Sequence, residues 1–287
     1  MEALDLAARS AGGRTVERIV VDNGSGDDSA TVLAESLRAD ELVLLSENRG
    51  FAAGVNAGLR RARGRLVLLL NSDTRAHGDA VARLAGALDD DGDAGLAGPV
   101  LLNEDGSAQL SAYRRFPTLA TVFLDFCFPL ANPLYGTRRH PYVLEPPRAG
   151  AGPRVVAHVM GAAMLVRADA ARQAGPLDEG YFLYLEETEW QGRLSAAGWR
   201  VLQVPGAKIT HLGGGSSSGY GFASPHLIAS LRRYFGGSRA LDAVIVAGAL
   251  ISLVAARAAC VLRPREPRYR ELSRACRSVV RTVITRS

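Results

Sequence analysis

A continuous apolar run that ends in polar residues is the feature that most constrains how this chain folds. Residues 66–70 are Leu-Val-Leu-Leu-Leu, and Asn71, Ser72 and Asp73 follow directly. An apolar run of this length without alternation predicts a strand buried on both faces, as in a parallel α/β sheet. Such sheets bind ligands outside the carboxyl ends of their strands, so the pattern would place Asp73 in a binding site. The alternative is that residues 71–74 only turn the chain and cap the next helix.

Strands and helices alternate along much of the sequence. We expect strands over 16–21, 42–45, 66–70, 94–100, 155–159, 163–166, 199–204 and 208–210. Helices are expected over 29–39, 51–63, 78–89 and 187–197, and residues 3–8 are expected to be the end of a helix that the glycines at 12 and 13 break. This alternation predicts right-handed βαβ units, hence an α/β fold with a mainly parallel sheet and helices on both faces. Residues from about 103 to 154 break the pattern and are interpreted as an insertion.

The C-terminal part of the chain differs in charge and hydropathy. The net charge is +5, and arginines crowd the tail after residue 262. Because no recognition helix, zinc finger or aromatic sheet motif accompanies them, we expect an anionic membrane surface as partner and no nucleic acid. The apolar segment 240–262 contains Asp242 and Arg257, and between these charges it is too short for a comfortable membrane span. It is expected either to pack on the domain or to lie in the membrane interface.

Cysteine usage and the first residues point to the cytoplasm. Cys127, Cys260 and Cys276 are far apart and form no disulfide or zinc pattern, which fits a reducing compartment. Residues 1–14 contain Glu2 and lack a long apolar core, so no signal peptide is expected. With the basic tail, this predicts a cytoplasmic protein at the inner face of the cell membrane.

Asp22, Asp73 and His211 fall near the ends of predicted strands, where they suit a metal site. Carboxylates at a sheet edge suit Mg²⁺ or Mn²⁺, and an imidazole favours Mn²⁺. An ion held there would bind a diphosphate. The alternative for His211 is a structural histidine.

Three further segments carry chemistry. Glu186 and Glu187 begin a predicted helix, where they either complement its dipole or supply a general base. Residues 48–58 are rich in small residues, which let a helix start approach a phosphate. The glycine-rich loop 213–219 either closes over a donor and excludes water or is a flexible linker.

In combination, these segments resemble family 2 glycosyltransferases. The matching motifs are Val-Val-Asp-Asn-Gly-Ser-Gly-Asp-Asp-Ser (20–29), Asn-Arg-Gly-Phe-Ala-Ala-Gly-Val-Asn-Ala-Gly (48–58), Leu-Asn-Ser-Asp-Thr (70–74), Gly-Ala-Ala-Met-Leu-Val-Arg (161–167) and Leu-Asp-Glu-Gly-Tyr-Phe-Leu-Tyr-Leu-Glu-Glu (177–187). The last of these, with Ala-Gly-Trp-Arg-Val (197–201) and His-Leu-Gly-Gly-Gly-Ser (211–216), is similar to the rhamnosyltransferase-like branch.

The resemblance, which covers residues 16 to about 217, implies a GT-A (Rossmann-like) fold. We expect this domain over residues 1–224, followed by a helical, membrane-associated segment over 225–287. The resemblance implies inverting transfer of a sugar, rhamnose by analogy with the branch, from a nucleoside diphosphate sugar. The acceptor would be a saccharide or a lipid-linked molecule in cell-surface polysaccharide assembly. Two alternatives are a catalytically impaired nucleotide-sugar binding relative and a sugar-phosphate nucleotidyltransferase, although the latter would need a glycine-rich loop with Arg and Lys near its N-terminus.

The resemblance also assigns roles to residues. Asp73 matches the metal-binding carboxylate of the family's Asp-x-Asp motif, in which Asn71 replaces the first aspartate, and His211 matches a second metal ligand. Glu187 falls at the position of the base, with Glu186 as the alternative. The implied donor-binding residues are Asp22, which would contact the base of the nucleotide, Asn23, Asn48, Gly50, Asn56, Asn71 and Asp73.

Family members begin with a strand and a helix before the strand that ends at Asp22. Here Met1 falls inside the position of that helix, so the family's first strand is expected to be absent. In the sheet order 3-2-1-4 it would lie between the strands that end at Asp22 and at Asp73. We expect a chain that lacks it to be unstable or inactive, because two buried sheet edges would keep unpaired backbone groups.

Overall fold

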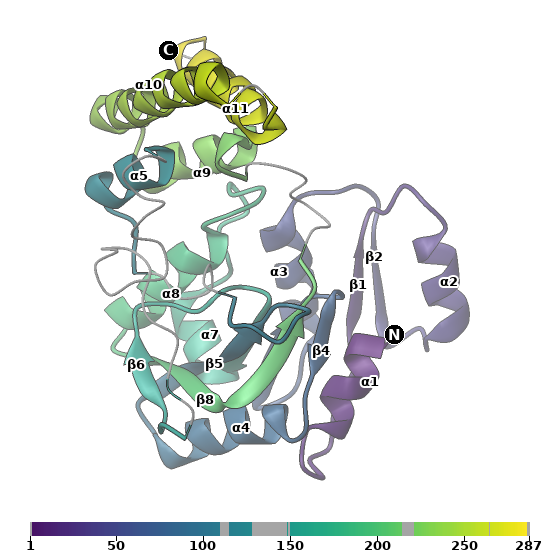
Figure 1. The fold of residues 1–287 in the computed structure, drawn as a ribbon. Helices are drawn as coiled ribbons and strands as arrows, with labels where there is room; N and C mark the ends of the chain where they lie inside the picture. The colour runs from purple at the N-terminus through teal and green to yellow at the C-terminus, as the bar shows by residue number, and fades with distance from the viewer. Residues whose placement is uncertain are drawn as a thin grey trace. The chain divides into compact units, whose positions relative to one another are not determined.

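The predicted alternation of strands and helices forms the first of two units in the computed structural model (Figure 1). The structure describes residues 2–109, 115–127, 148, 150–213, 221–263 and 265–285. The first unit comprises residues 1–114 and 146–213, and the second comprises 115–145 and 214–287. Of the expected insertion, residues 110–114, 128–147 and 149 lie outside the described residues. Residues 214–219 of the glycine-rich loop lie outside them as well.

Two sheets make up the first unit. Its elements are α1 (Glu2–Arg9), β1 (Val20–Asn23), α2 (Ser29–Ser36), β2 (Leu42–Leu45), α3 (Phe51–Arg61), β3 (Leu66–Leu70), β4 (Thr74–Ala76), α4 (Ala80–Asp90), β5 (Ala94–Leu102), β6 (Arg154–Val156), β7 (Ala163–Arg167), α7 (Ala168–Ala174), α8 (Glu186–Ala196) and β8 (Arg200–His211). Strands β1 and β2 pair in parallel and lie between α2 and α3 (Figure 1). The larger sheet has the order β3-β7-β5-β8-β4, and β6 pairs with β8.

The larger sheet is mixed, which corrects the expectation of a mainly parallel sheet. Strands β5 and β8 are parallel, but β7 lies antiparallel between β3 and β5, and β4 and β6 run antiparallel to β8. The two strands expected over 199–204 and 208–210 are one strand, β8, whose register against β5 shifts between Pro99 and Val100. The shift lets residues 205–207 bulge out, so the strand continues through Pro205.

Strand β3 shows how the helices cover both faces of this sheet. Leu69 is buried in a core with Met164 and Trp190, which lie on β7 and α8. Leu68 and Leu70 point the other way and pack against α1 and α4. The expected helices on both faces are therefore present. Leu69 is buried, but the other four residues of the strand are only partly buried.

Strand β3 lies at one edge of the larger sheet, and this position explains its partial burial. Strand β3 pairs with β7 alone and β1 pairs with β2 alone among the described strands, so neither bridges the two sheets. Residues 16–19, the first part of the first expected strand, lie outside β1. The two sheets of this unit are therefore connected through side chains and loops rather than through a common ladder of hydrogen bonds.

The second unit is helical in its described parts. It contains α5 (Leu119–Phe126), a short 3-10 helix η3 (Gly221–Ala223), α9 (Pro225–Tyr234), α10 (Arg239–Leu262) and α11 (Pro267–Ile284). Helix α10 packs closely on α5, where Ser252 Oγ donates to the carbonyl oxygen of Phe126 at 2.8 Å. Arg232 on α9 binds the Asp242 carboxylate at 2.9 and 3.0 Å. Asp242, one of the two charges expected to interrupt the apolar segment, is thus paired within the unit.

Helix α10 confirms the predicted apolar C-terminal helix. It has 24 residues and is long and apolar enough, by length and composition alone, to cross a membrane. At about 1.5 Å per residue such a helix matches a hydrocarbon core of roughly 30 Å. The basic tail also contains a helix, α11, which begins at Pro267.

Candidate active site

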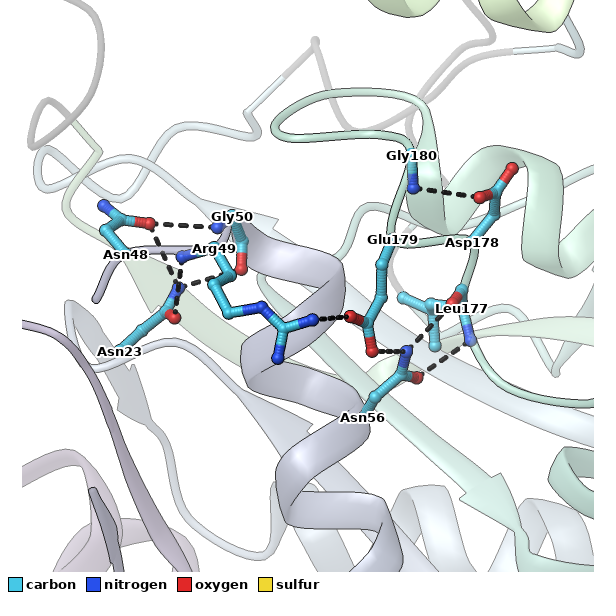
Figure 2. A network of polar contacts seen from close by, with 9 residues as sticks. All are labelled: Asn23, Asn48, Arg49, Gly50, Asn56, Leu177, Asp178, Glu179 and Gly180. Atoms are coloured by element: carbon cyan, nitrogen blue, oxygen red, sulfur yellow. Dashed lines mark hydrogen bonds and ion pairs between the residues drawn. The ribbon is translucent and has the colours of Figure 1, made fainter. Parts of the chain in front are cut away.

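The turn after β1 is built by the Asp22 and Asn23 side chains. Asp22 is buried, and its Oδ1 accepts hydrogen bonds from the backbone N–H groups of residues 24–25 at 3.1 and 3.0 Å. Asn23 Nδ2 donates to the carbonyl oxygen of Gly50 at 2.8 Å and to Asn48 Oδ1 at 3.2 Å (Figure 2). These bonds join the carboxyl ends of β1 and β2 into one polar surface. Four of the predicted donor-binding residues therefore lie together.

The start of α3 is covered by the segment that leads into α8. Gly50 has a φ of 90°, and a Cβ there would lie 2.4 Å from the carbonyl oxygen of Phe182. That oxygen accepts the Phe51 N–H at 2.9 Å, so this first N–H group of the helix is bound within the protein. Asn56, one turn further, is buried and exchanges two hydrogen bonds of 2.9 Å with the backbone of Leu177. The helix start thus holds a protein segment at the place where the sequence suggested a phosphate.

Asp73 and His211 meet at the ends of β3 and β8. Asp73 Oδ1 lies 3.5 Å from His211 Nε2, and the Asp73 carbonyl oxygen accepts the Leu212 N–H at 2.9 Å. Gln109, which the sequence pattern did not predict, has its Oε1 at 3.0 Å from His211 Nδ1. Its own Nε2 donates to Asn103 at 3.4 Å, which directs Oε1 towards the histidine. An Nδ1–H group can donate to Gln109 Oε1, and Nε2 is the ring nitrogen that faces Asp73.

This geometry fits two ligands of one divalent ion. Two cis ligands at the roughly 2.1 Å typical of a small divalent ion are about 3 Å apart, close to the observed separation. Asp73 and His211 have no third His, Cys, Asp or Glu beside them in a metal-sized group within the described part of the chain. An ion here would therefore leave most positions to water and substrate oxygens, as Mg²⁺ and Mn²⁺ do when they bind nucleotides.

Glu186 and Glu187 begin α8, and one carboxylate oxygen of each is buried, but Glu186 as a whole is the more buried residue. Glu186 is buried, with 4% of its surface exposed, and its Oε2 has no hydrogen-bond partner. Burial, with a further contribution from the charge of Glu187, raises the pKa of Glu186 to about 9. Glu186 is therefore protonated at neutral pH. Glu187 is only partly buried and lies over Gly161, where a Cβ would meet its Cγ at 3.4 Å.

The segment around Gly161 joins the separate parts of the site. A Cβ at Gly161 would also lie 3.5 Å from the Phe51 ring, so Glu187 and the start of α3 both border this glycine. The next residue, Ala162, accepts the Asn71 N–H at 2.9 Å. Glu187 and Asn71 therefore both border residues 161–162, and Asn71 precedes Asp73 by two residues.

An α/β unit with this polar edge has the GT-A fold of glycosyltransferases. A crystal structure of GalNAc-T7 with UDP, GalNAc and Mn²⁺ is similar, with a TM-score of 0.54 at 13% identity over 93% of this chain and 49% of that chain. The chain belongs to glycosyl transferase family 2, whose model matches residues 2–173. It spans about half the length of the GalNAc-T7 chain.

Two kinds of relative are similar in sequence. N-acetylglucosaminyl-diphospho-decaprenol L-rhamnosyltransferase of Mycobacterium tuberculosis is 28% identical over 209 residues, which cover 69% of this chain and 67% of that protein. Undecaprenyl-phosphate 4-deoxy-4-formamido-L-arabinose transferase of Klebsiella pneumoniae is 32% identical over 99 residues, 33% of this chain and 30% of that protein. The predicted family and the glycosyltransferase class are confirmed.

Proposed function

We propose that this glycosyltransferase moves a sugar, rhamnose by analogy with its relative, from a nucleoside diphosphate sugar to a lipid-linked saccharide. The transfer inverts the anomeric configuration and takes place at the cytoplasmic face of the cell membrane. The observation that carries the proposal is that Glu187 and Asn71 both border residues 161–162, while Asp73, which lies 3.5 Å from His211, follows Asn71 by two residues. The names of the similar rhamnosyltransferase and arabinose transferase support a lipid-linked acceptor.

Glu187 is the general base in this proposal. It accepts the proton of the acceptor hydroxyl as the hydroxyl oxygen attacks the anomeric carbon, and the sugar–diphosphate bond breaks on the opposite face. Direct displacement needs one base, whereas a retaining double displacement would need a nucleophile in addition. Glu186 keeps its own proton at neutral pH because of its burial, so it does not compete for this role.

Asp73 and His211 are proposed to hold Mn²⁺ or Mg²⁺. A divalent ion supplies charge neutralisation for a leaving diphosphate. The chain's own contribution is to fix the two ligands, since Gln109 holds the imidazole with Nε2 towards the carboxylate. Mn²⁺ is present in the similar GalNAc-T7 structure, which supports a divalent ion here.

The remaining predicted donor residues divide into two groups. The turn of residues 22–25 with Asn48 is proposed to receive the nucleoside, because Asp22 and Asn23 already fix its backbone. Asn71 is proposed to contact the donor beside Asp73.

The second unit is proposed to contact an anionic membrane surface. On α11, Ser273, Cys276, Val279 and Val283 are buried, and the exposed side carries arginines. These arginines are Arg268, Arg270, Arg274, Arg277 and Arg281. Helix α10, which packs against α11, exposes five large apolar residues, namely Leu250, Ile251, Val254, Val261 and Leu262. Apolar side chains beside basic ones match the interfacial region of an anionic bilayer.

A transfer assay tests the proposal. The purified protein is incubated with candidate nucleoside diphosphate sugars, Mn²⁺ and an N-acetylglucosaminyl-diphospho-prenol acceptor. Release of nucleoside diphosphate that depends on the acceptor, with a product of inverted configuration, is the expected result. Binding of a donor without turnover would indicate an impaired relative, and release of pyrophosphate would indicate a nucleotidyltransferase. Either of these outcomes would overturn the proposal.

A further inference from the structure

The backbone immediately before α8 is held in an unfavourable conformation. Tyr184 and Leu185 have φ angles of 74° and 68°, and they are the two non-glycine residues with positive φ among the described residues. The left-handed region is disfavoured for residues with a Cβ, and such residues persist where the surrounding structure holds them. Because this turn ends at Glu186, its conformation sets the direction in which Glu186 and Glu187 leave the backbone.

A network of polar contacts fastens the segment that leads into this turn (Figure 2). Asn56 Oδ1 accepts the Leu177 N–H and Asn56 Nδ2 donates to the Leu177 carbonyl oxygen, both at 2.9 Å. The same Nδ2 donates to Glu179 Oε1 at 3.0 Å, and Glu179 Oε2 binds the Arg49 guanidinium at 2.9 Å. Together with the bond from Phe51 to Phe182, these contacts attach residues 177–182 to the first turns of α3.

The chemistry of Glu179 suits this bridging position. One carboxylate oxygen faces the Asn56 amide and the other faces Arg49, and both partners are donors. A carboxylate accepts from both at once, whereas a glutamine in either orientation would set its NH₂ group against one donor. The ion pair is largely exposed, with side-chain exposures of 53% for Arg49 and 34% for Glu179. Exposed pairs contribute little to global stability, so the pair matters here for geometry rather than for folding.

We infer that Asn56 and Glu179 are positioning residues, which hold segment 177–185 on α3 and thereby fix the start of α8 with Glu187. The inference rests on the proposed role of Glu187 as base. It replaces the donor contact predicted for Asn56, because Asn56 is 2% exposed and both its amide atoms bind the segment. The motif of residues 48–58 then serves catalysis indirectly, by supporting the loop that carries the base.

Amide hydrogen exchange and steady-state kinetics together test this inference. The variants are Glu179→Gln and Asn56→Leu. The control is Asp40→Asn, which breaks the exposed pair of Arg38 and Asp40 at 3.0 Å. In Glu179→Gln and Asn56→Leu, amides of residues 180–189 should exchange roughly 10-fold faster or more, while those of β5 keep their protection.

The kinetic arm separates positioning from donor binding. The kcat of the two variants should fall about 10- to 100-fold, because a small misplacement of a reacting group is costly, while KM for the donor changes less than about 2-fold. An increase in donor KM at unchanged kcat would make these residues donor contacts and overturn the inference.

Exchange is measured without substrate, so it decides the structural claim even if the transfer assay fails. Unchanged exchange at residues 180–189 in both variants would refute the inference. Should Asn56→Leu fail to fold, Glu179→Gln still decides the outcome, because its side chain is partly exposed and tolerates substitution.

Discussion

Replacing Glu186 with glutamine should change how the stability of the protein depends on pH. Burial raises the pKa of Glu186 from 4.5 to about 9, with the Glu187 charge as the second cause. Between these two values the unfolded chain releases the proton and the folded protein retains it. Stability is therefore unaffected by this group below about pH 4.5, falls as the pH rises through the window, and levels off above about pH 9.

The magnitude follows from the width of this window. Each pH unit within it costs about 1.4 kcal/mol, so at pH 7 the buried carboxyl lowers the free energy of unfolding by on the order of 3 kcal/mol. A glutamine has nearly the same shape and no proton to retain. We expect Glu186→Gln to be more stable than the parent by up to this amount at pH 7, by more at pH 8.5, and by much less at pH 5.

Urea unfolding followed by tryptophan fluorescence measures this difference. Both tryptophans, Trp190 and Trp199, lie in the first unit, and Trp190 is fully buried on α8 itself. Glu35→Gln, at an exposed position of α2, is the matched control and should show no such gain with pH. Glu187→Gln should keep most of the slope, since burial is the larger cause. A stability difference for Glu186→Gln that stays constant from pH 5 to 8.5 would refute the protonated state of Glu186.

Three further outcomes are expected. Glu187→Gln should lower kcat about 10²- to 10⁴-fold with donor affinity unchanged, as measured by turnover and calorimetry, and a larger loss in Glu186→Gln would move the base by one residue. Asp73→Ala and His211→Ala should each weaken Mn²⁺-dependent donor binding in calorimetry, and a full metal response in His211→Ala would leave this histidine a structural role. The protein should bind vesicles with anionic lipids and release them at high salt, with each arginine near the surface contributing about 1 kcal/mol before screening; equal binding to neutral vesicles would remove the membrane contact.

Local patterns in the sequence predicted most of the elements of the first unit. The apolar run of residues 66–70 is β3, and the helix expected from Glu187 begins one residue earlier at Glu186. Such patterns carry no information on strand direction, and this is why the antiparallel entry of β7 between β3 and β5 was not predicted. The C-terminal segment was expected to be helical, and the buried residues 276, 279 and 283 of α11 follow helical spacing.

The parts of the site that depend on distant contacts were less accessible. Asp73 and His211 were predicted as partners and lie 3.5 Å apart. Gln109 reaches His211 because a bridge between Leu102 and Ala108 turns the chain back, and nothing in its own neighbourhood marks it. The positioning roles inferred for Glu179 and Asn56 depend on the contact of Asn56 with Leu177, which is 121 positions away in the sequence. These residues gain their meaning from tertiary packing, which a local pattern does not contain.

The separation of β1 and β2 from the larger sheet has a consequence for motion. The pair is attached through α3, where Gly58 approaches Val21 and Arg61 donates to the carbonyl oxygens of Ala39 and Leu42 at 3.1 and 3.4 Å. Elements joined by side chains rather than by a shared ladder open separately and at lower free energy than a central strand such as β5. A nucleotide bound at residues 22–25 would stabilise this small sheet selectively. The slowing of amide exchange in β1 and β2 would then give the donor affinity directly, without any turnover.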